Sequence, residues 1–464
     1  MTMWQPRLAG RQGPKYRQIS DAIGESVRDG LLTGGSRLPP QRDLAYALGV
    51  SLNTVSRAYT DAVERGFLKG EVGRGTYVRD GGARTAEAPP ATLTRPATGP
   101  IDFSLNLPAP SPAAQALAGT LADLAGTDDL AACLDYQTAG DGTAHLAAAA
   151  RWLGRVGLEA APEAVVFTVG AQHGIVAALL ATLRPGDVLL TEALTYAPIT
   201  AMALQLGLKL VPVRSEDGRL TAEALDSACG RVAAKALYCL PTLHTPTTAT
   251  LDAERRAAIA EVARRRDLTL IEDDVFGFLP PQRPPPLACF APERTLYITS
   301  LSKSLAPGLR VGLLAAPPAQ ARAARNAVRL SSWMPPPLMA EIARRWIEDG
   351  TAEALNAFQR DEARARQAMA RELLPAPYLE ANPHGFHAWL TLPPQWTPEL
   401  FRMAAQDRGV KVLVGGAFAV DPSDSPQAVR LCLSHESRRT RVREGLSVLA
   451  DLLQTGSGTE TVLL

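Results

Sequence analysis

Apolar residues follow two different rhythms along the chain. In residues 1–79 they recur every three or four positions, which is the spacing of one helical face. This spacing predicts a helix over residues 16–31, a second over 41–48 and a third from 51 to about 65. From residue 101 to 454, short β-branched runs alternate with helical stretches. That alternation is typical of a mostly parallel α/β sheet with helices on its faces.

The same spacing predicts which side chains face inward in the N-terminal region. In the first helix these are Tyr16, Ile19, Ile23, Val27 and Leu31. In the third helix they are Leu52, Val55, Tyr59 and Val63. Residues 73–78 (GRGTYV) follow the third helix and are predicted to form a β-hairpin.

Residues 80–100 (DGGARTAEAPPATLTRPATGP) have no apolar period and are rich in Pro, Gly, Ala and Thr. Such a composition favours an extended, semi-stiff linker. We therefore expect an N-terminal domain over 1–79, a linker over 80–100 and a large domain over 101–454. The tail, 455–464, begins polar and Gly-rich, and we expect it to be frayed.

Composition narrows the class of protein. Residues 1–80 hold 12 Lys and Arg against 8 Asp and Glu, a net charge of +4, whereas the rest of the chain carries −3. A basic head fits nucleic-acid binding, though only weakly. The five cysteines are scattered without C-x-x-C or Cys/His spacing, which predicts no metal site and a reducing, cytoplasmic setting. No signal peptide and no apolar run long enough for a membrane span is found.

The second and third predicted helices have the spacing of a helix-turn-helix motif. Gly49 permits the turn and Ser51 can cap the third helix. Asn53, Thr54 and Arg57 keep the start of that helix polar, where a recognition helix meets bases and phosphates. A small three-helix domain without a ligand is the plainer alternative.

The string RLPPQRDLAYALGVSLNTVSRAYTDAVERGFL…GRGTYV resembles the GntR family of winged-helix regulators over nearly all of residues 14–79. The resemblance implies a double-stranded DNA operator as partner. It implies that Arg42, Thr54 and Arg57 touch DNA and that Gly75 shapes the wing. Ser51 and Asn53 are predicted to belong to the same DNA-binding surface.

Four local patterns in the body point to one chemistry. A strand over 165–169 ends in Gly170, Ala171 and Gln172 at a helix start, which can hold a phosphate. Another strand ends in the acids of residues 272–274, where a carboxylate can hold a protonated pyridine nitrogen.

The third pattern, residues 300–312 (SLSKSLAPGLRVG), places a lysine in a Ser-, Gly- and Pro-rich turn after a strand. Such a lysine can form a Schiff base with an aldehyde cofactor. The fourth is Arg430 inside an apolar strand, which pairs either with a structural acid or with a ligand carboxylate.

Together, residues 101–454 resemble fold-type I pyridoxal-phosphate (PLP) enzymes of the aminotransferase class I/II group. That resemblance implies a mostly parallel sheet, a small C-terminal α+β domain and PLP as cofactor. It implies Lys303 as the PLP-bonding lysine and Asp273 as the partner of the pyridine nitrogen. The phosphate would be held by Ala171, Gln172, Ser300, Ser302 and Arg310.

The resemblance extends to the rest of the site and to the assembly. Tyr196 would stack on the ring, and Tyr136 would reach the phosphate of a neighbouring subunit. Arg430 would take a ligand α-carboxylate, and Asn106 is expected to line the same pocket. Because sites of this group are built between subunits, a homodimer is implied.

Two positions depart from the pattern of the enzymes. The usual H-Q-N-P-T-G reads LHTPTT at residues 243–248, so Thr245 replaces the asparagine. Phe276 replaces the tyrosine of the usual D-x-x-Y. In the enzymes both lost side chains bond the phenolic oxygen of PLP, so efficient transamination is not expected. PLP binding is expected to survive, because the lysine, the aspartate and the phosphate-binding residues are retained. Thr245 can still offer one hydroxyl to the cofactor.

Three interpretations remain. A GntR-like head on this body resembles the MocR subfamily of regulators, in which the PLP domain senses an amino compound or PLP itself. Alternatively, the body is an active aminotransferase with an accessory head, as the retained Lys303, Asp273 and Arg430 indicate. A PLP-free dimerisation body is the third possibility.

Overall fold

The computed structural model describes residues 4–6, 8, 13–28, 31–32, 35–64, 67–71, 75–78, 98–136, 142–215 and 218–455. By internal contacts the chain divides into two compact units, Met1–Ala91 and Thr92–Leu464. The division falls inside the segment that the sequence predicts as a linker. Most of that segment, and the predicted tail beyond residue 455, lie outside the described residues.

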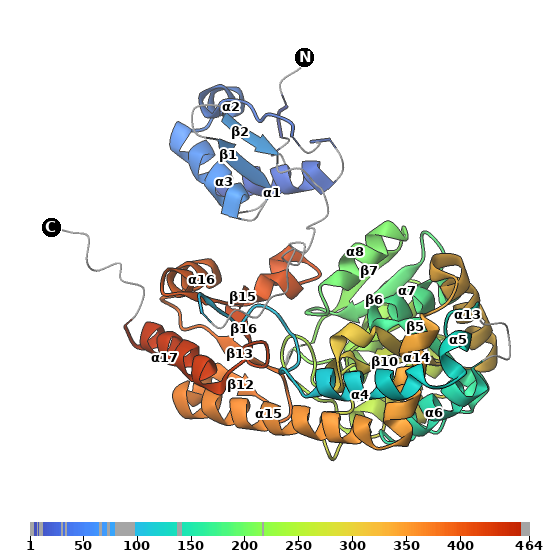
Figure 1. Ribbon diagram of the computed structural model, residues 1–464. Coiled ribbons are helices and arrows are strands. Elements are labelled where there is room, and N and C mark those ends of the chain that lie inside the picture. The colour runs from blue at the N-terminus through green and yellow to red at the C-terminus, as the bar shows by residue number, and fades with distance from the viewer. Residues whose placement is uncertain are drawn as a thin grey trace. The chain divides into compact units, whose positions relative to one another are not determined.

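The N-terminal unit contains three helices and a hairpin within its described residues (Figure 1). The helices are α1 (Lys15–Arg28), α2 (Gln41–Leu48) and α3 (Leu52–Glu64), and the antiparallel strands are β1 (Leu68–Glu71) and β2 (Gly75–Val78). A shared apolar core, to which all three helices and the hairpin contribute, holds them together; it includes Ile19, Ile23, Leu44, Val55, Tyr59, Leu68 and Val78. This is the predicted winged helix-turn-helix order.

Three of the predicted inward positions were wrong. Leu31 lies beyond the end of α1 and is 73 % exposed, while its neighbour Leu32 is buried. Leu52 and Val63 lie at the two ends of α3, and both are exposed. In each case the apolar spacing continues past the part of the helix that the small core can cover.

The body of the larger unit is built on a seven-stranded sheet of order β5-β11-β10-β9-β8-β6-β7. Its strands are β5 (Val165–Val169), β6 (Val188–Glu192), β7 (Lys209–Val213), β8 (Ala234–Cys239), β9 (Thr269–Asp273), β10 (Thr295–Ser300) and β11 (Val311–Ala315). Neighbouring strands pair in parallel from β10 to β7, and β11 is antiparallel to both of its neighbours. The mostly parallel sheet expected from the sequence is confirmed.

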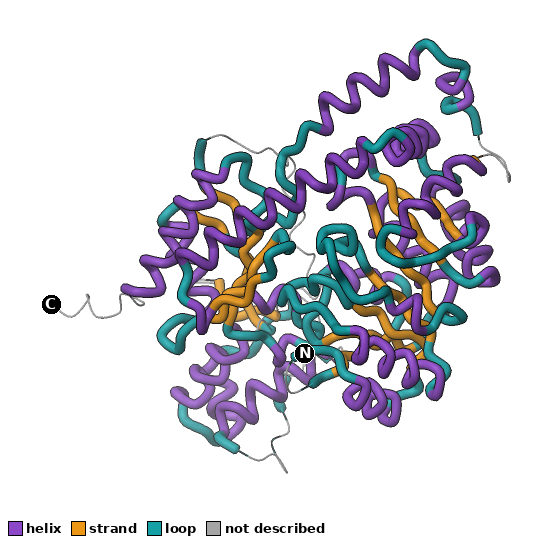
Figure 2. Tube along the Cα trace, turned by 90° about the horizontal axis from the view of Figure 1, so that it is seen from below, coloured by secondary structure: helices purple, strands orange, loops and turns teal. Residues whose placement is uncertain are grey.

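Helices cover both faces of this sheet, as the view in Figure 2 shows. Side chains of one strand alternate between two apolar layers, so that Leu189 and Ile298 face one layer while Leu190 and Tyr297 face the other. The first layer contains α7 (Gly170–Thr182), α8 (Pro198–Gln205) and α13 (Pro318–Ser332). The opposite face is covered by α6 (Thr143–Gly154), α9 (Ala222–Arg231), α10 (Ala253–Arg265), α11 (Leu287–Phe290) and α14 (Pro337–Glu348).

Shorter elements complete the description of this part. They are α4 (Ala113–Ala125), α5 (Asp129–Ala132), α12 (Leu301–Ser304), and the 3-10 turns η1 (Pro162–Ala164) and η2 (Pro307–Leu309). No helix in the described ranges is long and apolar enough to cross a membrane.

The C-terminal part forms the predicted small α+β domain. A four-stranded sheet of order β12-β13-β16-β15 contains β12 (Leu379–Ala381), β13 (His387–Thr391), β15 (Leu413–Val414) and β16 (Ala428–Cys432). Three helices accompany it: α15 (Thr351–Leu373), α16 (Pro398–Asp407) and α17 (Arg439–Thr455). The 3-10 turns here are η3 (Ala376–Tyr378), η4 (Gly415–Phe418) and η5 (Pro422–Asp424).

The first strand of the larger unit joins this C-terminal part. β3 (Ile101–Asp102) pairs in parallel with β14 (Val410–Lys411), and Phe103 is fully buried in the C-terminal core. Residues 103–107 are therefore placed beside β16 and the end of the central sheet, since Phe103 accepts a hydrogen bond from the Cys432 amide.

Candidate functional site

The start of α3 presents a polar surface. The Ser51 hydroxyl accepts a hydrogen bond from the Thr54 amide at 3.1 Å and lies 2.8 Å from the Thr54 hydroxyl, as expected of a helix cap. Asn53 and Arg57 are exposed on the same first turns. Of the predicted DNA-contacting side chains on α3 and at its cap, Ser51, Asn53 and Arg57 are therefore exposed, and Thr54 is half-buried.

Arg57, Arg42 and the Gly75 position complete the predicted DNA-binding surface. The Arg57 guanidinium lies 4.0 Å from the centre of the Tyr16 ring, which restricts its motion without neutralising its charge. Arg42 is exposed on α2. In the hairpin, Gly75 has a φ of +119°, and a Cβ there would lie 3.0 Å from Nε of Arg37, so glycine suits this wing position.

In the body, Lys303 lies one turn beyond the end of β10. Ser300 caps the short helix α12 that carries it, accepting a hydrogen bond from the Ser302 amide at 3.4 Å. The lysine amine donates to the backbone oxygen of Asn106. Loss of solvent lowers the pKa of Lys303 to about 8, and the nearby charge of Arg430 acts in the same direction. The amine is therefore uncharged, and nucleophilic, more often than that of a surface lysine.

Asp273 ends β9 and is buried. Its Oδ2 accepts a hydrogen bond from the Tyr238 hydroxyl at 2.6 Å, while its Oδ1 has no partner within the described part of the chain. Burial raises the pKa of Asp273 to about 6. A buried carboxylate with one free oxygen is a suitable partner for a protonated ring nitrogen.

The predicted phosphate-binding residues meet at the start of α7. Ser300, Gly312 and Thr168 lie side by side on three adjacent strands. Arg310 reaches across to donate to the Val169 carbonyl at 3.2 Å, and a Cβ on Gly170 would lie only 2.4 Å from its Nη2. Only glycine at 170 thus leaves room for the guanidinium above the helix start.

Further groups at this end can receive an anion. Ala171 and Gln172 belong to the first turn of α7, where backbone N–H groups lack helical partners. The hydroxyl oxygen of Ser302 is buried and has no hydrogen-bond partner in the described structure. Together with the Arg310 cation, these groups could bind a phosphate.

Arg430 lies on β16 and has no carboxylate partner among the described residues. Its Nη2 donates to the Ser104 carbonyl at 2.7 Å, its guanidinium carbon lies 4.7 Å from the Phe418 ring centre, and its Nε is buried and unpaired. Of the two interpretations that the sequence left open, the contacts favour a ligand carboxylate. Burial raises the pKa of Tyr196 to about 12, so its phenol stays neutral.

Both departures from the enzyme pattern lie inside the protein. Phe276 is buried, and its ring centre lies 5.9 Å from that of Phe386 and 5.7 Å from that of His387. The Lys303 amine lies 5.8 Å from the centre of the Phe276 ring. Thr245 is also buried. The side of the site where the enzymes place a phenol is therefore apolar.

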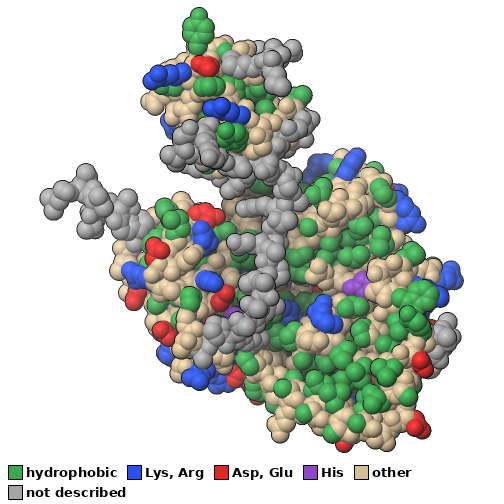
Figure 3. All heavy atoms as spheres, turned by 45° about the horizontal axis from the view of Figure 1, so that its top comes forward, with side chains coloured by type: hydrophobic (Ala, Val, Ile, Leu, Met, Phe, Trp, Pro, Cys, Tyr) green, Lys and Arg blue, Asp and Glu red, His purple; other side chains and the backbone are tan. Residues whose placement is uncertain are grey.

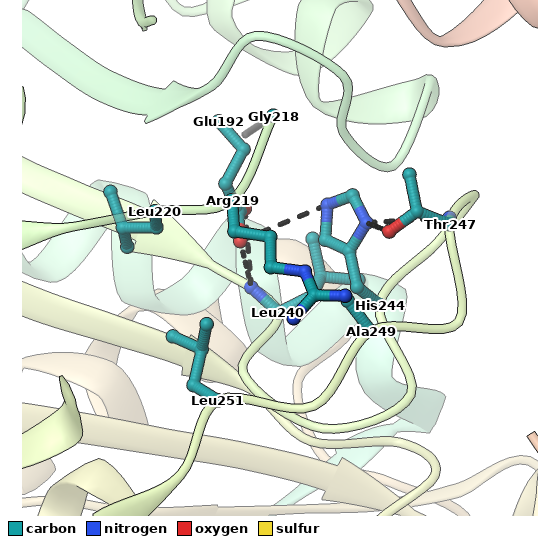
Figure 4. Close-up of a pocket in the computed structure, with 9 residues that line it drawn as sticks. All are labelled: Glu192, Gly218, Arg219, Leu220, Leu240, His244, Thr247, Ala249 and Leu251. Carbon is teal, nitrogen blue, oxygen red and sulfur yellow. Dashed lines mark hydrogen bonds and ion pairs between the residues drawn. The ribbon is translucent and has the colours of Figure 1, made fainter. Parts of the chain in front are cut away.

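The loop that carries Thr245 is anchored through His244 (Figure 4). Its Nδ1 lies 2.9 Å from the Thr247 hydroxyl and its Nε2 lies 3.0 Å from the Leu194 carbonyl. Glu192, which accepts from the Leu240 amide, faces the same ring at 3.8 Å. These contacts fix the backbone of the loop beside the site.

Sequence reasoning missed three side chains of this region: Tyr238, His244 and His387. Each is a polar residue in a buried strand or loop. His387 lies in the apolar strand β13, and a polar residue inside an apolar strand is the same signal that singled out Arg430. Tyr136, by contrast, is predicted to serve a partner subunit, and it is 76 % exposed, with its ring 6.0 Å from that of Trp333.

Fold and site together define a DNA-binding protein whose body is a fold-type I domain for PLP. Residues 110–446 match the model of the aminotransferase class I and II family, and residues 15–78 match that of the bacterial regulatory proteins of the gntR family. The chain belongs to the aminotransferase class I and II family, and its GntR-type head gives it the architecture of a MocR-type transcription regulator.

Relatives share this architecture along most of their length. The chain is 29 % identical over 450 residues to the uncharacterized HTH-type transcriptional regulator YdeF of Bacillus subtilis, covering 97 % of this chain and 96 % of YdeF. It is 28 % identical over 428 residues to the vitamin B6 salvage pathway transcriptional repressor PtsJ of Salmonella typhimurium, covering 91 % and 95 %.

Solved structures similar to the body include aminotransferases. An archaeal alanine:glyoxylate aminotransferase matches with a TM-score of 0.70 and 24 % identity over 77 % of this chain and 92 % of its own. LysN of Thermus thermophilus, solved with N-(5'-phosphopyridoxyl)-L-leucine, matches with a TM-score of 0.67 and 24 % identity over 77 % and 93 %. These matches show the fold of the body.

The residues present fit the cofactor of this family. The free Oδ1 of Asp273, the unpaired hydroxyl of Ser302 and the space kept by Gly170 are the three features that the ring nitrogen and the phosphate need. When bound, PLP supplies an aldehyde that reacts with amines and a ring that withdraws electrons. The chain supplies an amine of lowered pKa at Lys303 and a buried carboxyl group at Asp273, whose pKa is raised to about 6.

Proposed function

We propose that this protein is a PLP-dependent transcription regulator that binds an operator through its head and senses an amino compound, or PLP itself, through its body. The observation that carries the proposal is a site that keeps its cofactor-binding residues but has Phe276 and Thr245 in place of the groups that assist turnover. Such a site can bind and report without efficient chemistry.

For the head, we propose that Arg42, Ser51, Asn53, Thr54 and Arg57 contact the operator, with the Gly75 wing beside them. Their support is exposure and the cap at the start of α3. Because an operator lies on the chromosome, the regulator would act in the cytoplasm, on the nucleoid.

For the body, we propose that Lys303, Asp273, Tyr196 and Thr245 contact PLP and that its phosphate is held by Ala171, Gln172, Ser300, Ser302 and Arg310. Arg430 would bind the carboxylate of an effector, since no described acid pairs with it. An effector shifts the regulator between two states only by binding one of them more tightly. Replacement of Lys303 by alanine should abolish the visible absorbance band of lysine-bound PLP, whereas a wild-type chain without that band would refute cofactor binding.

We further propose a homodimer. Hydrophobic side chains are gathered on one face of the larger unit in Figure 3. Large apolar residues stay exposed, among them Leu134, Leu330 and Trp333, which are 80, 90 and 53 % exposed, and the Trp333 ring lies 6.0 Å from that of Tyr136. Exposed apolar clusters of this kind mark interfaces. Tyr136 would then reach the phosphate of the partner subunit.

The decisive experiment measures binding of the full-length protein to the DNA upstream of its own gene. PLP and a panel of amino acids are added in turn, and the operator affinity is followed by fluorescence anisotropy. We expect specific binding that changes with at least one of these ligands. Binding that is unchanged by PLP and by every amino acid would refute the sensing function.

A second candidate is an active aminotransferase with an accessory head. The lowered pKa of Lys303 and the unpaired Nε of Arg430 favour it. Steady turnover of an amino acid with a keto acid by the purified protein would support it. Operator binding without turnover would exclude it.

A further inference from the structure

Leu52 is an exposed apolar residue at the start of α3 that the core of the N-terminal unit does not use. It is the first residue of that helix and is 43 % exposed. The apolar core takes Val55 and Tyr59 from the same helix, and Leu52 is not among the described residues that pack in it or against it. Single exposed leucines are common on protein surfaces, so the meaning of this one depends on what surrounds it.

The local structure directs the Leu52 side chain towards the start of the helix. Ser51 caps α3 by accepting a hydrogen bond from the Thr54 amide at 3.1 Å, so Leu52 occupies the first helical position. Val50, which precedes the cap, packs against the same core as Val55 and so fixes the entry of the chain. Because the Cα–Cβ bonds of a helix tilt towards its N-terminus, the Leu52 side chain points to that end. Neither the cap nor the core requires a leucine at this position.

The groups around Leu52 are those of a surface that meets DNA. Asn53 and Arg57 are exposed on the same first turns, and the first turn of α3 has no acidic residue. The N-terminal 80 residues carry a net positive charge, which is complementary to the phosphates of DNA. A recognition helix places its N-terminal side chains against base edges in the major groove. Leu52 therefore belongs to the end of α3 that faces the bases when the head binds an operator.

The chemistry of leucine determines which base it favours. Base edges in the major groove present hydrogen-bond donors and acceptors, and the 5-methyl group of thymine is the apolar group among them. Leucine offers no hydrogen bond, so against a polar edge it would displace water without replacing the lost bond. Against the methyl group of thymine it removes apolar surface from water on both sides.

We infer that Leu52 reads a thymine of the operator through its 5-methyl group. The inference rests on the proposed operator binding and deepens it, because it assigns one base of the sequence to one side chain of the head. The polar side chains at the start of α3 contact phosphates and the polar edges of bases. Leu52 adds an apolar contact to this surface and is a specificity-determining residue.

The test begins with a pool of random DNA duplexes, from which the full-length wild type and Leu52→Ala each select their preferred sequences. The wild type should select thymine at one position where Leu52→Ala accepts any base. In a duplex of the selected sequence, deoxyuridine then replaces that thymine, which removes only the 5-methyl group. At constant salt, the affinity of the wild type should fall about fourfold for each methyl group removed, and that of Leu52→Ala should not change.

Val63→Ala is the matched control, because Val63 is also an exposed apolar residue of α3 but lies at the other end of the helix. It should select the same thymine as the wild type and show the same loss of affinity with deoxyuridine. Leu52→Ala should unfold at the same temperature as the wild type, since the core does not include the side chain that it truncates.

The outcomes separate this inference from the proposed function. A wild type that binds the thymine and deoxyuridine duplexes equally well overturns the inference alone, and so does an equal loss of affinity in the wild type and Leu52→Ala. Complete loss of sequence preference in Leu52→Ala also overturns it, because removal of one apolar contact leaves the polar contacts in place. If the wild type selects no sequence from the pool, both the operator binding and this inference fail.

Discussion

Asp273→Asn tests whether the body contains a buried carboxylate that pairs with the protonated ring nitrogen of PLP. Burial raises the pKa of Asp273 from 3.8 to about 6. At 1.36 kcal/mol for each tenfold change, an ionised Asp273 costs the cofactor-free protein about 3 kcal/mol above pH 6. Because the pKa is raised on folding, this cost is nearly absent below about pH 4 and grows as pH rises towards 6. The neutral amide avoids the cost and can still accept from Tyr238.

The assay is unfolding of the cofactor-free full-length protein by calorimetry between pH 4 and 8, following the transition of the larger unit. Asp273→Asn should unfold at a higher temperature than wild type at pH 8 and at nearly the same temperature at pH 4. Saturating PLP should reverse the order at pH 8, because only the carboxylate pairs with a protonated ring nitrogen. Asp407→Asn, at an exposed position on α16, removes the same charge and should show no such trend.

A stability difference between wild type and Asp273→Asn that is constant over this pH range would refute the reasoning. So would greater stabilisation of the variant than of wild type by PLP. Either result would mean that Asp273 is not the buried carboxylate with a raised pKa and a free Oδ1 on which the prediction rests.

Three further changes test other parts of the site. Arg57→Ala should weaken operator binding and reduce the slope of log affinity against log salt by about one, and an unchanged slope would contradict a phosphate contact. Gly170→Ala should weaken PLP binding at least tenfold, because the new Cβ would displace Arg310. Gly186→Ala should not weaken it, because Gly186 also has a positive φ but has open space around it. An equal loss of PLP affinity in both variants would assign the effect to the backbone. Phe276→Tyr restores a donor to the phenolic oxygen and should lower the pH midpoint of the absorbance band of bound PLP by about one unit; no shift would mean that the new hydroxyl does not reach the cofactor.

The parts of the fold that sequence predicts well are those in which local pattern and final environment agree. Asp273 is the last residue of one buried strand and Lys303 lies one turn beyond another, so the position of each in the chain already places it at the edge of the sheet where ligands bind. The turn at Gly49 likewise follows from local chemistry, since its φ of 61° is one that glycine adopts freely.

The sequence predictions fail where a residue's environment depends on distant parts of the fold. Leu31, Leu52 and Val63 satisfy the helical spacing, yet the N-terminal unit is too small to cover them, and spacing alone carries no measure of core size. His387 was missed because its neighbour in the fold, Asn106, lies 281 residues away in the chain. The tautomer of His387 is set by the His244 carbonyl, and His387 in turn contacts Asn106. This arrangement joins three segments that are distant in the sequence, so no local pattern predicts it.

Binding and turnover depend on opposite sides of the same site. In the proposed site, the phosphate end and Asp273 would hold the cofactor without a contact from Phe276, whose ring packs against Phe386 and His387. The apolar packing that takes away a donor from the phenolic oxygen also buries the His387 ring and so keeps it neutral. That neutrality is what makes Nδ1 an acceptor for Asn106. The feature that argues against efficient transamination therefore leaves the proposed cofactor-binding end of the site unchanged, as a sensing domain requires.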